Sequence, residues 1–226
     1  MELFYPEYRL QAPGLLIFDL DGTLADTIGG IRDGVNLAMQ KYGFPQRSYE
    51  EIRIAIGNGA RELIRRSVPT DTSKDTALVD RVYEDYNLFY GQTYGNCQPY
   101  EGIRECLATL RERGYTLAVL SNKQDAYVKA MTVEIFGEEL FSYIAGQTEL
   151  PRKPDPTVPL LIASSLNFSP AGTAFVGDSD VDVQTGRNAG MLAVGCSWGY
   201  RDRSALIEKG AHAVVDAPME LAELFT

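Results

Sequence analysis

The 226-residue sequence is poor in the residues on which several classes of protein depend. Its 3 cysteines are widely separated and odd in number, so neither a disulfide framework nor a CxxC metal site is indicated. Reduced thiols in a cytoplasmic protein are the simplest expectation. The sequence holds 1 histidine, His212, which lies beside an expected strand without a partner motif, and we expect it to be structural.

Long apolar runs and basic residues are also scarce. No run approaches the roughly 20 residues that a membrane-spanning helix requires. Residues 1–14 lack the basic and apolar regions of a secretory signal, so we expect neither membrane insertion nor secretion. The 21 Lys and Arg residues against 31 Asp and Glu residues give a formal net charge of −10. This charge argues against nucleic acid as a partner, because such binding depends on basic side chains that neutralise phosphates.

The stretch LLIFDLDGTLAD, residues 15–26, is the first with a clear chemical signal. Its apolar residues 15–18 predict a buried parallel strand, and Asp19 and Asp21 follow directly. A carboxylate that leaves water loses several kcal/mol unless a cation compensates it. The two aspartates therefore indicate either a metal site or, more simply, capping of a strand-to-helix turn.

The sequence from about residue 27 to 96 has a different character, because it lacks strand-like runs and shows helical periodicity. The first expected helix has an apolar face of Ile31, Val35, Leu37 and Ala38. Ser48 and Glu51 predict a capping box for the second, and further helices are expected over 61–67 and 77–89. We expect a helical domain at 27–96, inserted into a core domain of 1–26 and 97–226.

The rest of the chain alternates between helical and strand patterns. Strands are expected at 116–120, 143–145, 173–176, 192–195 and 213–215, with helices between most of them. This alternation is typical of an α/β fold with a doubly wound, mostly parallel sheet. In such folds ligands bind outside the carboxyl ends of the strands, near the point where the strand order reverses.

Polar residues follow four of the expected strands. Beyond Asp19 and Asp21 they are Ser121, Asn122 and Lys123; Lys153 with Pro154; and Asp178, Ser179, Asp180 and Asp182. Carboxylates with a hydroxyl, an amide and a lysine suit metal-assisted phosphoryl transfer better than hydride chemistry. By contrast, the SWGY stretch at 197–200 has no predicted chemical role.

Each residue type in this set has a use in phosphoryl transfer. Mg²⁺ prefers oxygen ligands, which Asp19, Asp178 and the backbone carbonyl of Asp21 can supply. Lys153, Ser121 and backbone N–H groups around Asp21 and Gly22 can offset the charge of a phosphate. One carboxylate can then attack phosphorus, and a second, two residues on, can protonate the leaving oxygen.

Four ordered motifs resemble those of the haloacid dehalogenase-like phosphatases. They are DLDGT at 19–23, LSN at 120–122, Lys153 with Pro154, and GDSDVD at 177–182. The resemblance covers essentially the whole chain, and it implies a haloacid dehalogenase-like core of the Rossmann type with an inserted helical cap. It implies the following roles: Asp19 as nucleophile and metal ligand, Asp21 as general acid and base and as a backbone ligand, Asp178 as third metal ligand, Asp182 behind the ligands, Ser121 and Lys153 on the phosphoryl oxygens, and Asn122 beside them.

The resemblance also gives the helical insertion an interpretation, as a cap that closes over the substrate. IGNGARELI, at 56–64, is similar to the cap segment of phosphoglycolate phosphatases. It makes Asn58, Gly59 and Arg61 candidate substrate-binding residues. For Arg61 a plain solvent-facing charge is equally expected.

We therefore expect a cytoplasmic, Mg²⁺-dependent phosphomonoester hydrolase that acts on a small phosphorylated metabolite through an aspartyl-phosphate, similar to phosphoglycolate phosphatases. A phosphosugar mutase, or a pyrophosphate or nucleotide phosphatase of the same family, stays open. A non-catalytic module that binds phosphorylated ligands is disfavoured because the motifs are intact, and dehalogenation because that chemistry dispenses with the metal cluster. The sequence leaves open a monomer and a homodimer.

Overall fold

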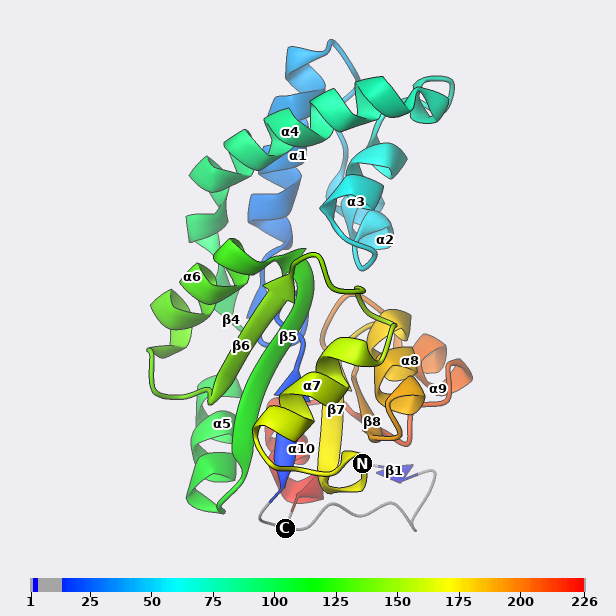
Figure 1. Ribbon diagram of the computed structural model, residues 1–226. Helices are drawn as coiled ribbons and strands as arrows, with labels where there is room; N and C mark the ends of the chain where they lie inside the picture. Colours follow the sequence, from blue (N-terminus) through cyan, green and yellow to red (C-terminus); the bar gives the residue numbers. More distant parts are fainter. Residues whose placement is uncertain (1, 4–13, 226) are drawn as a thin grey trace. The chain divides into compact units, whose positions relative to one another are not determined.

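The computed structural model describes residues 2–3 and 14–225 of the chain. The segment on which the absence of a secretory signal was judged therefore lies largely outside the described residues. The chain divides into two compact units (Figure 1). Residues up to 25 and from 99 onward form the α/β unit, and residues 26–98 form the helical unit.

A seven-stranded sheet, in the order β1-β9-β8-β7-β2-β5-β6, forms the centre of the α/β unit. The strands are β1 (Glu2–Leu3), β2 (Leu15–Phe18), β5 (Thr116–Gln124), β6 (Tyr143–Gln147), β7 (Thr173–Gly177), β8 (Leu192–Cys196) and β9 (Ala213–Val215). All neighbouring strands pair in parallel except β1, which pairs antiparallel with β9 at the edge. The prediction of a mostly parallel sheet is thus confirmed.

The order of the strands reverses at β2. From β2 the chain builds outward through β5 and β6 on one side, and then through β7, β8 and β9 on the other. Leu15 lies opposite both Thr116 and Thr173, so β2 is held between β5 and β7 along its length. All four residues of β2 are buried, as expected for an apolar strand covered on both faces.

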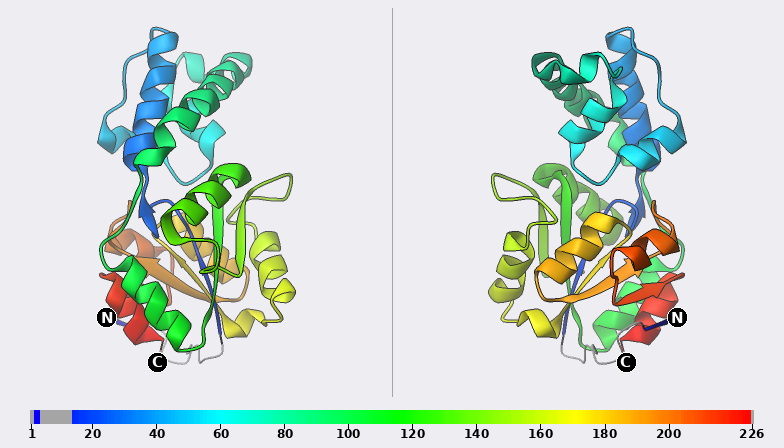
Figure 2. Two further views of the ribbon diagram at one scale, coloured as in Figure 1. Left: turned by 90° about the vertical axis from the view of Figure 1, so that its left-hand side faces the viewer. Right: turned by 90° about the vertical axis from the view of Figure 1, so that its right-hand side faces the viewer.

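Helices cover both faces of this sheet. They are α5 (Ile103–Glu112), α6 (Asp125–Phe136), α7 (Thr157–Ser165), α8 (Asp180–Asn188), α9 (Arg203–Glu208) and α10 (Pro218–Leu224), with a 3₁₀ turn at Pro170–Gly172. In Figure 2, α5 and α10 lie on one face and α7 and α8 on the other. One core cluster joins Leu15 and Ile17 of β2 to Phe175 of β7 and Ile162 of α7. This is the doubly wound arrangement that the alternating pattern predicted.

The helical unit contains α1 (Ile28–Lys41), α2 (Tyr49–Ala55), α3 (Ala60–Ser67) and α4 (Thr76–Thr93), with 3₁₀ turns at Thr72–Lys74 and Tyr94–Asn96. The capping box of Ser48 and Glu51 is present at the start of α2, as predicted. The prediction for Leu37 was wrong, since this side chain is exposed. It follows Val35 by two residues, and a helix turns that position away from the buried face.

Other short elements and strand ends depart from the sequence-based expectation. A two-stranded sheet of β3 (Ala25–Asp26) and β4 (Gln98–Pro99) forms where the chain passes between the units. Strand β5 continues to Gln124, four residues beyond the expected end, through Ser121, Asn122 and Lys123. Among the described residues no helix has the length and apolar content to cross a membrane.

Candidate active site

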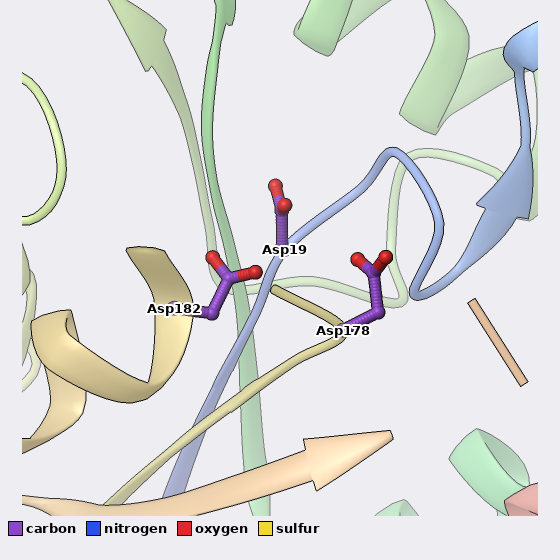
Figure 3. A group of neighbouring side chains, drawn as sticks. All are labelled: Asp19, Asp178 and Asp182. Atoms are coloured by element: carbon purple, nitrogen blue, oxygen red, sulfur yellow. The ribbon is translucent and has the colours of Figure 1, made fainter. Parts of the chain in front are cut away.

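Three buried carboxylates meet at the carboxyl ends of the central strands. Asp19 follows β2, Asp178 follows β7, and Asp182 lies in the first turn of α8 (Figure 3). One oxygen of each lies within 4.8 Å of the others. The backbone N–H of Asp19 donates to the carbonyl of Val176, which carries the β2–β7 pairing up to the site. The cluster thus occupies the switch point of the sheet.

Asp19 is held by one of its two carboxylate oxygens. Oδ1 accepts the backbone N–H of Leu20 at 2.7 Å and lies 3.0 Å from Nζ of Lys153. Oδ2 accepts no hydrogen bond from the described part of the chain. Burial raises the pKa of Asp19 to about 7, and nearby Asp182 and Asp21 add to this effect while Lys153 opposes it. One oxygen is therefore fixed while the other stays available.

Asp178 is fixed by both oxygens. Its Oδ1 accepts the hydroxyl of Thr23 at 3.0 Å, and its Oδ2 accepts the backbone N–H of Tyr200 at 2.7 Å. Burial raises the pKa of Asp178 well above its usual range, and the charges of Asp182 and Asp19 raise it further. A buried acidic group of this kind favours a cation as its partner.

The SWGY stretch, to which the sequence assigned no role, packs against the site. Trp198 Nε1 donates to the carbonyl of Thr23 at 3.0 Å, and Tyr200 binds Asp178 as described above. A Cβ atom on Gly199 would lie 2.2 Å from the Gly22 carbonyl oxygen and 2.3 Å from Cβ of Asp178. Glycine at 199 lets this loop touch both the DLDGT turn and the aspartate.

Lys153 bridges two of the carboxylates from a buried position. Its Nζ lies 3.0 Å from Asp19 and 2.7 Å from Asp182. Burial alone would lower the pKa of Lys153, but the charges of Asp182 and Asp19 outweigh it and raise this pKa. The side chain of Asn122 holds the lysine's backbone, since its amide nitrogen donates to the Lys153 carbonyl at 3.0 Å and its oxygen accepts the Lys153 N–H at 2.9 Å.

Asp182 has both of its oxygens engaged by the protein. Oδ1 binds Lys153, and Oδ2 accepts the backbone N–H and the hydroxyl of Ser179 at 3.0 and 2.5 Å. Ser179 and Asp182 form a capping box at the start of α8, which the sequence analysis missed because the usual acidic partner is Glu or Gln. Asp182 therefore organises Lys153 and the helix start.

Asp21 and its neighbours form the second part of the site. Its two oxygens lie 2.6 and 2.8 Å from Nζ of Lys123. Ser121 is buried, and its Oγ accepts the Lys123 N–H at 3.3 Å. The backbone N–H of Gly22 donates to the carbonyl of Ala25 at 2.9 Å, and substrate binding by Gly22 stays a prediction.

The charges of the site suit one divalent cation. The residues named above include four carboxylates, on Asp19, Asp21, Asp178 and Asp182, and two lysines, Lys123 and Lys153. Two negative charges are left over when all six groups are ionised. A divalent ion would neutralise them, and hard carboxylate and carbonyl oxygens are the donors that Mg²⁺ takes.

The candidates in the helical unit lie at the turn between α2 and α3. Asn58 is in this turn, Gly59 is the N-cap of α3, and Arg61 lies in its first turn. Nε of Arg61 is 2.5 Å from Asp80 of α4, with both side chains about half exposed. Elsewhere, His212 accepts the backbone N–H of Ala193 through Nδ1, which fits the structural role expected for it.

A doubly wound sheet with buried carboxylates and a lysine at its switch point defines an α/β enzyme. The family to which it belongs is shown by its sequence. The profile of the "Haloacid dehalogenase-like hydrolase" family matches residues 16–196. The chain belongs to this family, as the four motifs predicted.

Relatives of the chain carry a more specific name. It is 31% identical over 210 residues to the phosphoglycolate phosphatase of Pseudomonas syringae pv. syringae, covering 91% of this chain and 77% of that protein. It is 34% identical over 209 residues to the one from Haemophilus influenzae Rd, covering 89% and 93%. The crystal structure of a predicted phosphoglycolate phosphatase from Haemophilus somnus superposes with a TM-score of 0.83 at 27% identity, over 93% and 97% of the two chains. The prediction of a hydrolase of the phosphatase class is confirmed.

Proposed function

We propose that this enzyme is a Mg²⁺-dependent phosphomonoester hydrolase in which Asp19 forms an aspartyl-phosphate. The observation that carries the proposal is the asymmetry of Asp19: Oδ1 is held by Leu20 and Lys153, while Oδ2 is left without a partner among the described residues. A nucleophile needs such an oxygen, fixed in place and not engaged elsewhere.

Two steps complete the reaction. In the first, Oδ2 of Asp19 attacks phosphorus, the bond from phosphorus to the leaving oxygen breaks, and the carboxyl group of Asp21 protonates that oxygen. In the second, water attacks phosphorus and gives a proton to Asp21, while the bond between phosphorus and Asp19 breaks. Inorganic phosphate leaves, and both carboxyl groups return to their first state.

Mg²⁺ would be held by the side chains of Asp19 and Asp178 and by the backbone carbonyl of Asp21. It would supply positive charge where charge builds up on the phosphoryl oxygens. Hydrogen bonds from Thr23 and from the backbone of Tyr200 orient Asp178 as a metal ligand. The ion pair with Asp182 keeps Lys153 beside Asp19. The Ser121 hydroxyl donates to no acceptor among the described residues, so it can donate to a phosphoryl oxygen.

Phosphoglycolate is the substrate that we propose, on the strength of relatives that carry this activity in their names. We assign the role of a cap to the inserted segment 27–96, with Asn58, Gly59 and Arg61 as its substrate-binding residues. The cytoplasm remains the proposed location, since the thiols of Cys97, Cys106 and Cys196 are buried and form no disulfide.

A phosphate-release assay with Mg²⁺ tests the proposal. The panel includes phosphoglycolate, hexose phosphates, nucleotides and pyrophosphate, compared by kcat/KM. Asp19→Asn should lower turnover at least about 10³-fold, since the amide cannot act as the nucleophile. The Asp33→Asn variant, which alters an aspartate of the helical unit that is paired with Arg32, is the matched control and should retain activity.

The products of the reaction distinguish the proposed aspartyl-phosphate hydrolysis from the mutase and from ligand binding without catalysis. Acid quenching during turnover of ³²P-labelled substrate should leave label on the wild-type protein and none on the Asp19→Asn variant. Transfer of label to a sugar phosphate, giving a bisphosphate, would instead indicate a mutase. Binding of phosphorylated ligands without turnover of any member of the panel would contradict the enzymatic proposal.

A further inference from the structure

Lys123 forms an ion pair with Asp21 that is largely shielded from solvent. None of the four motifs assigns a role to Lys123. It is the third residue after Leu120 in β5, and its Nζ contacts both oxygens of Asp21, at 2.6 and 2.8 Å. Only 8% of the Lys123 side chain and 12% of the Asp21 side chain is exposed. Such a contact is screened by water and salt far less than an exposed pair.

We propose that Lys123 is a positioning residue, which holds the Asp21 carboxylate in the orientation needed for proton transfer with the substrate. This inference rests on the proposed function, in which Asp21 is the general acid and base. A general acid must lie within hydrogen-bond reach of the leaving oxygen, so the direction of its carboxyl group decides its use. The Lys123 ammonium lies within hydrogen-bond distance of both oxygens and so holds this carboxylate in place from one side.

The geometry of β5 explains how one strand serves both parts of the site. The pairing of β5 with β6 shifts register between Leu120 and Gln124, so Ser121 and Lys123 lie in an irregular stretch of the strand. The Lys123 N–H donates to Ser121 Oγ at 3.3 Å, which ties the two residues together. Asn122, between them, is turned to the main chain of Lys153. This stretch thus supplies both the Ser121 hydroxyl and the Lys123 ammonium to the proposed site.

The orientation of Asp21 matters because the charged carboxylate of Asp19 lies nearby. The charge of Asp21 acts on Asp19, which in turn lies in the cluster with Asp178 and Asp182. Mutual repulsion pushes such groups apart. The Lys123 ammonium opposes this repulsion at Asp21, as Lys153 does at Asp19. Each of the two proposed reacting carboxylates therefore has its own lysine, buried for Asp19 and partly buried for Asp21.

The experiment compares two substrates that differ in their need for an acid. Phosphoglycolate loses an alkoxide, which must be protonated, whereas p-nitrophenyl phosphate loses a stable phenolate, which need not be. The value of kcat/KM reports the first chemical step for both. We expect Lys123→Met to lower kcat/KM for phosphoglycolate about 10- to 100-fold, as part of the 10²–10⁴-fold that general acids contribute. The value for p-nitrophenyl phosphate should change less than about threefold.

Two further variants test whether the effect depends on the positive charge of Lys123 and on its position. Lys123→Arg retains a cation and should restore much of the phosphoglycolate activity. Lys129→Met removes a lysine that pairs with Asp125 on the exposed side of α6, and it should affect neither substrate. Equal loss with both substrates would mean that Lys123 acts on the phosphoryl group or on folding, and it would overturn the inference. No loss with either substrate would overturn it as well.

Asp21→Asn separates this inference from the proposed function. If Asp21 is the acid, this variant should lose phosphoglycolate activity selectively and more severely than Lys123→Met does. If Asp21→Asn shows no selective loss, the assignment of the acid is wrong. If Asp21→Asn is selective and Lys123→Met is not, the acid stands and the positioning role of Lys123 fails.

Discussion

The charge pairs at the proposed site differ in sequence separation and burial from the local pairs on the helices of the helical unit. In the helical unit, several arginines pair with carboxylates three or four residues away, as in Arg53 with Glu50 and Arg65 with Glu62, and these four side chains are 22–59% exposed. In the α/β unit, Lys153 pairs with Asp19 and Asp182, which are distant in sequence, and all three are buried.

The exposed local pairs mainly keep the surface soluble, whereas the buried pairs belong to the proposed site. Exposed local pairs contribute little, because water and salt screen them and their side chains lose entropy on pairing. Buried charges are costly to keep without a partner, so the fold retains them only with several contacts each. The α/β unit also leaves an excess of negative charge at one point, whereas the helical pairs cancel locally. The predictions below test this contrast.

The largest effect is expected at Lys153. Lys153→Met leaves Asp19 and Asp182 close together without their shared cation, and breaking such a buried pair costs about 3–5 kcal/mol. Urea denaturation should show this loss, and phosphate release should fall as well. Lys129→Met, at an exposed pair, is the control and should leave the denaturation midpoint nearly unchanged. Equal midpoints for the two variants would remove the distinction between buried and exposed charge pairs.

A smaller effect is expected where a loop touches the site without a charge. Gly199→Ala places a methyl group against the Gly22 carbonyl and Asp178, and overpacking of this kind costs about 1–3 kcal/mol. Because Asp178 must shift, affinity for Mg²⁺ should fall about tenfold, measured by calorimetry without substrate. Gly29→Ala, where no atom lies within 4 Å of the added carbon, serves as the control. Unchanged affinity in Gly199→Ala would contradict the role given to this loop.

The excess negative charge predicts how metal binding depends on pH. Because burial raises the pKa of Asp19 to about 7 from the ordinary 3.8, the folded chain keeps a proton that the unfolded chain has lost between these values. The contribution of Asp19 to the free energy of unfolding of the metal-free protein therefore falls as pH rises from 3.8 to about 7. Mg²⁺ must displace the proton, so the gain in Tm on adding Mg²⁺ should be larger at about pH 8 than at about pH 5.

Asp19→Asn provides the control for this dependence. The amide has no proton to exchange with the metal, so the difference between the two pH values should shrink in this variant. Differential scanning fluorimetry with Mg²⁺ or with a chelator measures it. A gain in Tm that is the same at both pH values in the wild type would mean that Asp19 does not bind the ion.

The smallest effect is expected in the helical unit, at Arg61. Its partner Asp80 is exposed, so Arg61→Ala should shift Tm by no more than about 2 °C. If this arginine binds substrate, KM for phosphoglycolate should rise severalfold with little change in kcat. Arg65→Ala, on the same helix and paired with Glu62, is the matched control. Identical kinetics for the two variants would remove Arg61 from the proposed cap residues.

Local signals in the sequence predicted local structure well. The capping box at Ser48 was foreseen because Ser and Glu stand three residues apart, and the buried strand β2 because its four apolar residues are contiguous. Leu37 was assigned to the wrong face, since it lies two residues after Val35, half a turn of helix away. The capping box of Ser179 and Asp182 was missed because aspartate is not its usual acidic member.

The end of β5 shows why part of the site escaped prediction. The polar run Ser121, Asn122 and Lys123 resembles a loop, yet it continues the strand. Two of these side chains have a partner that is remote in the chain: Lys123 binds Asp21, and Asn122 binds Lys153. Such partners cannot be identified from spacing along one sequence.

The sequence alone determined the family, the order of the longer strands and helices, and the aspartates and lysine of the four motifs, because these depend on residue type and local spacing. Tertiary structure alone decided which oxygen of Asp19 is held, that Asp182 serves Lys153, that Lys123 holds Asp21, and that the SWGY stretch contacts Asp178. These contacts join residues up to about 175 positions apart, as between Trp198 and Thr23. Only the packing of strands side by side brings such residues within hydrogen-bond distance.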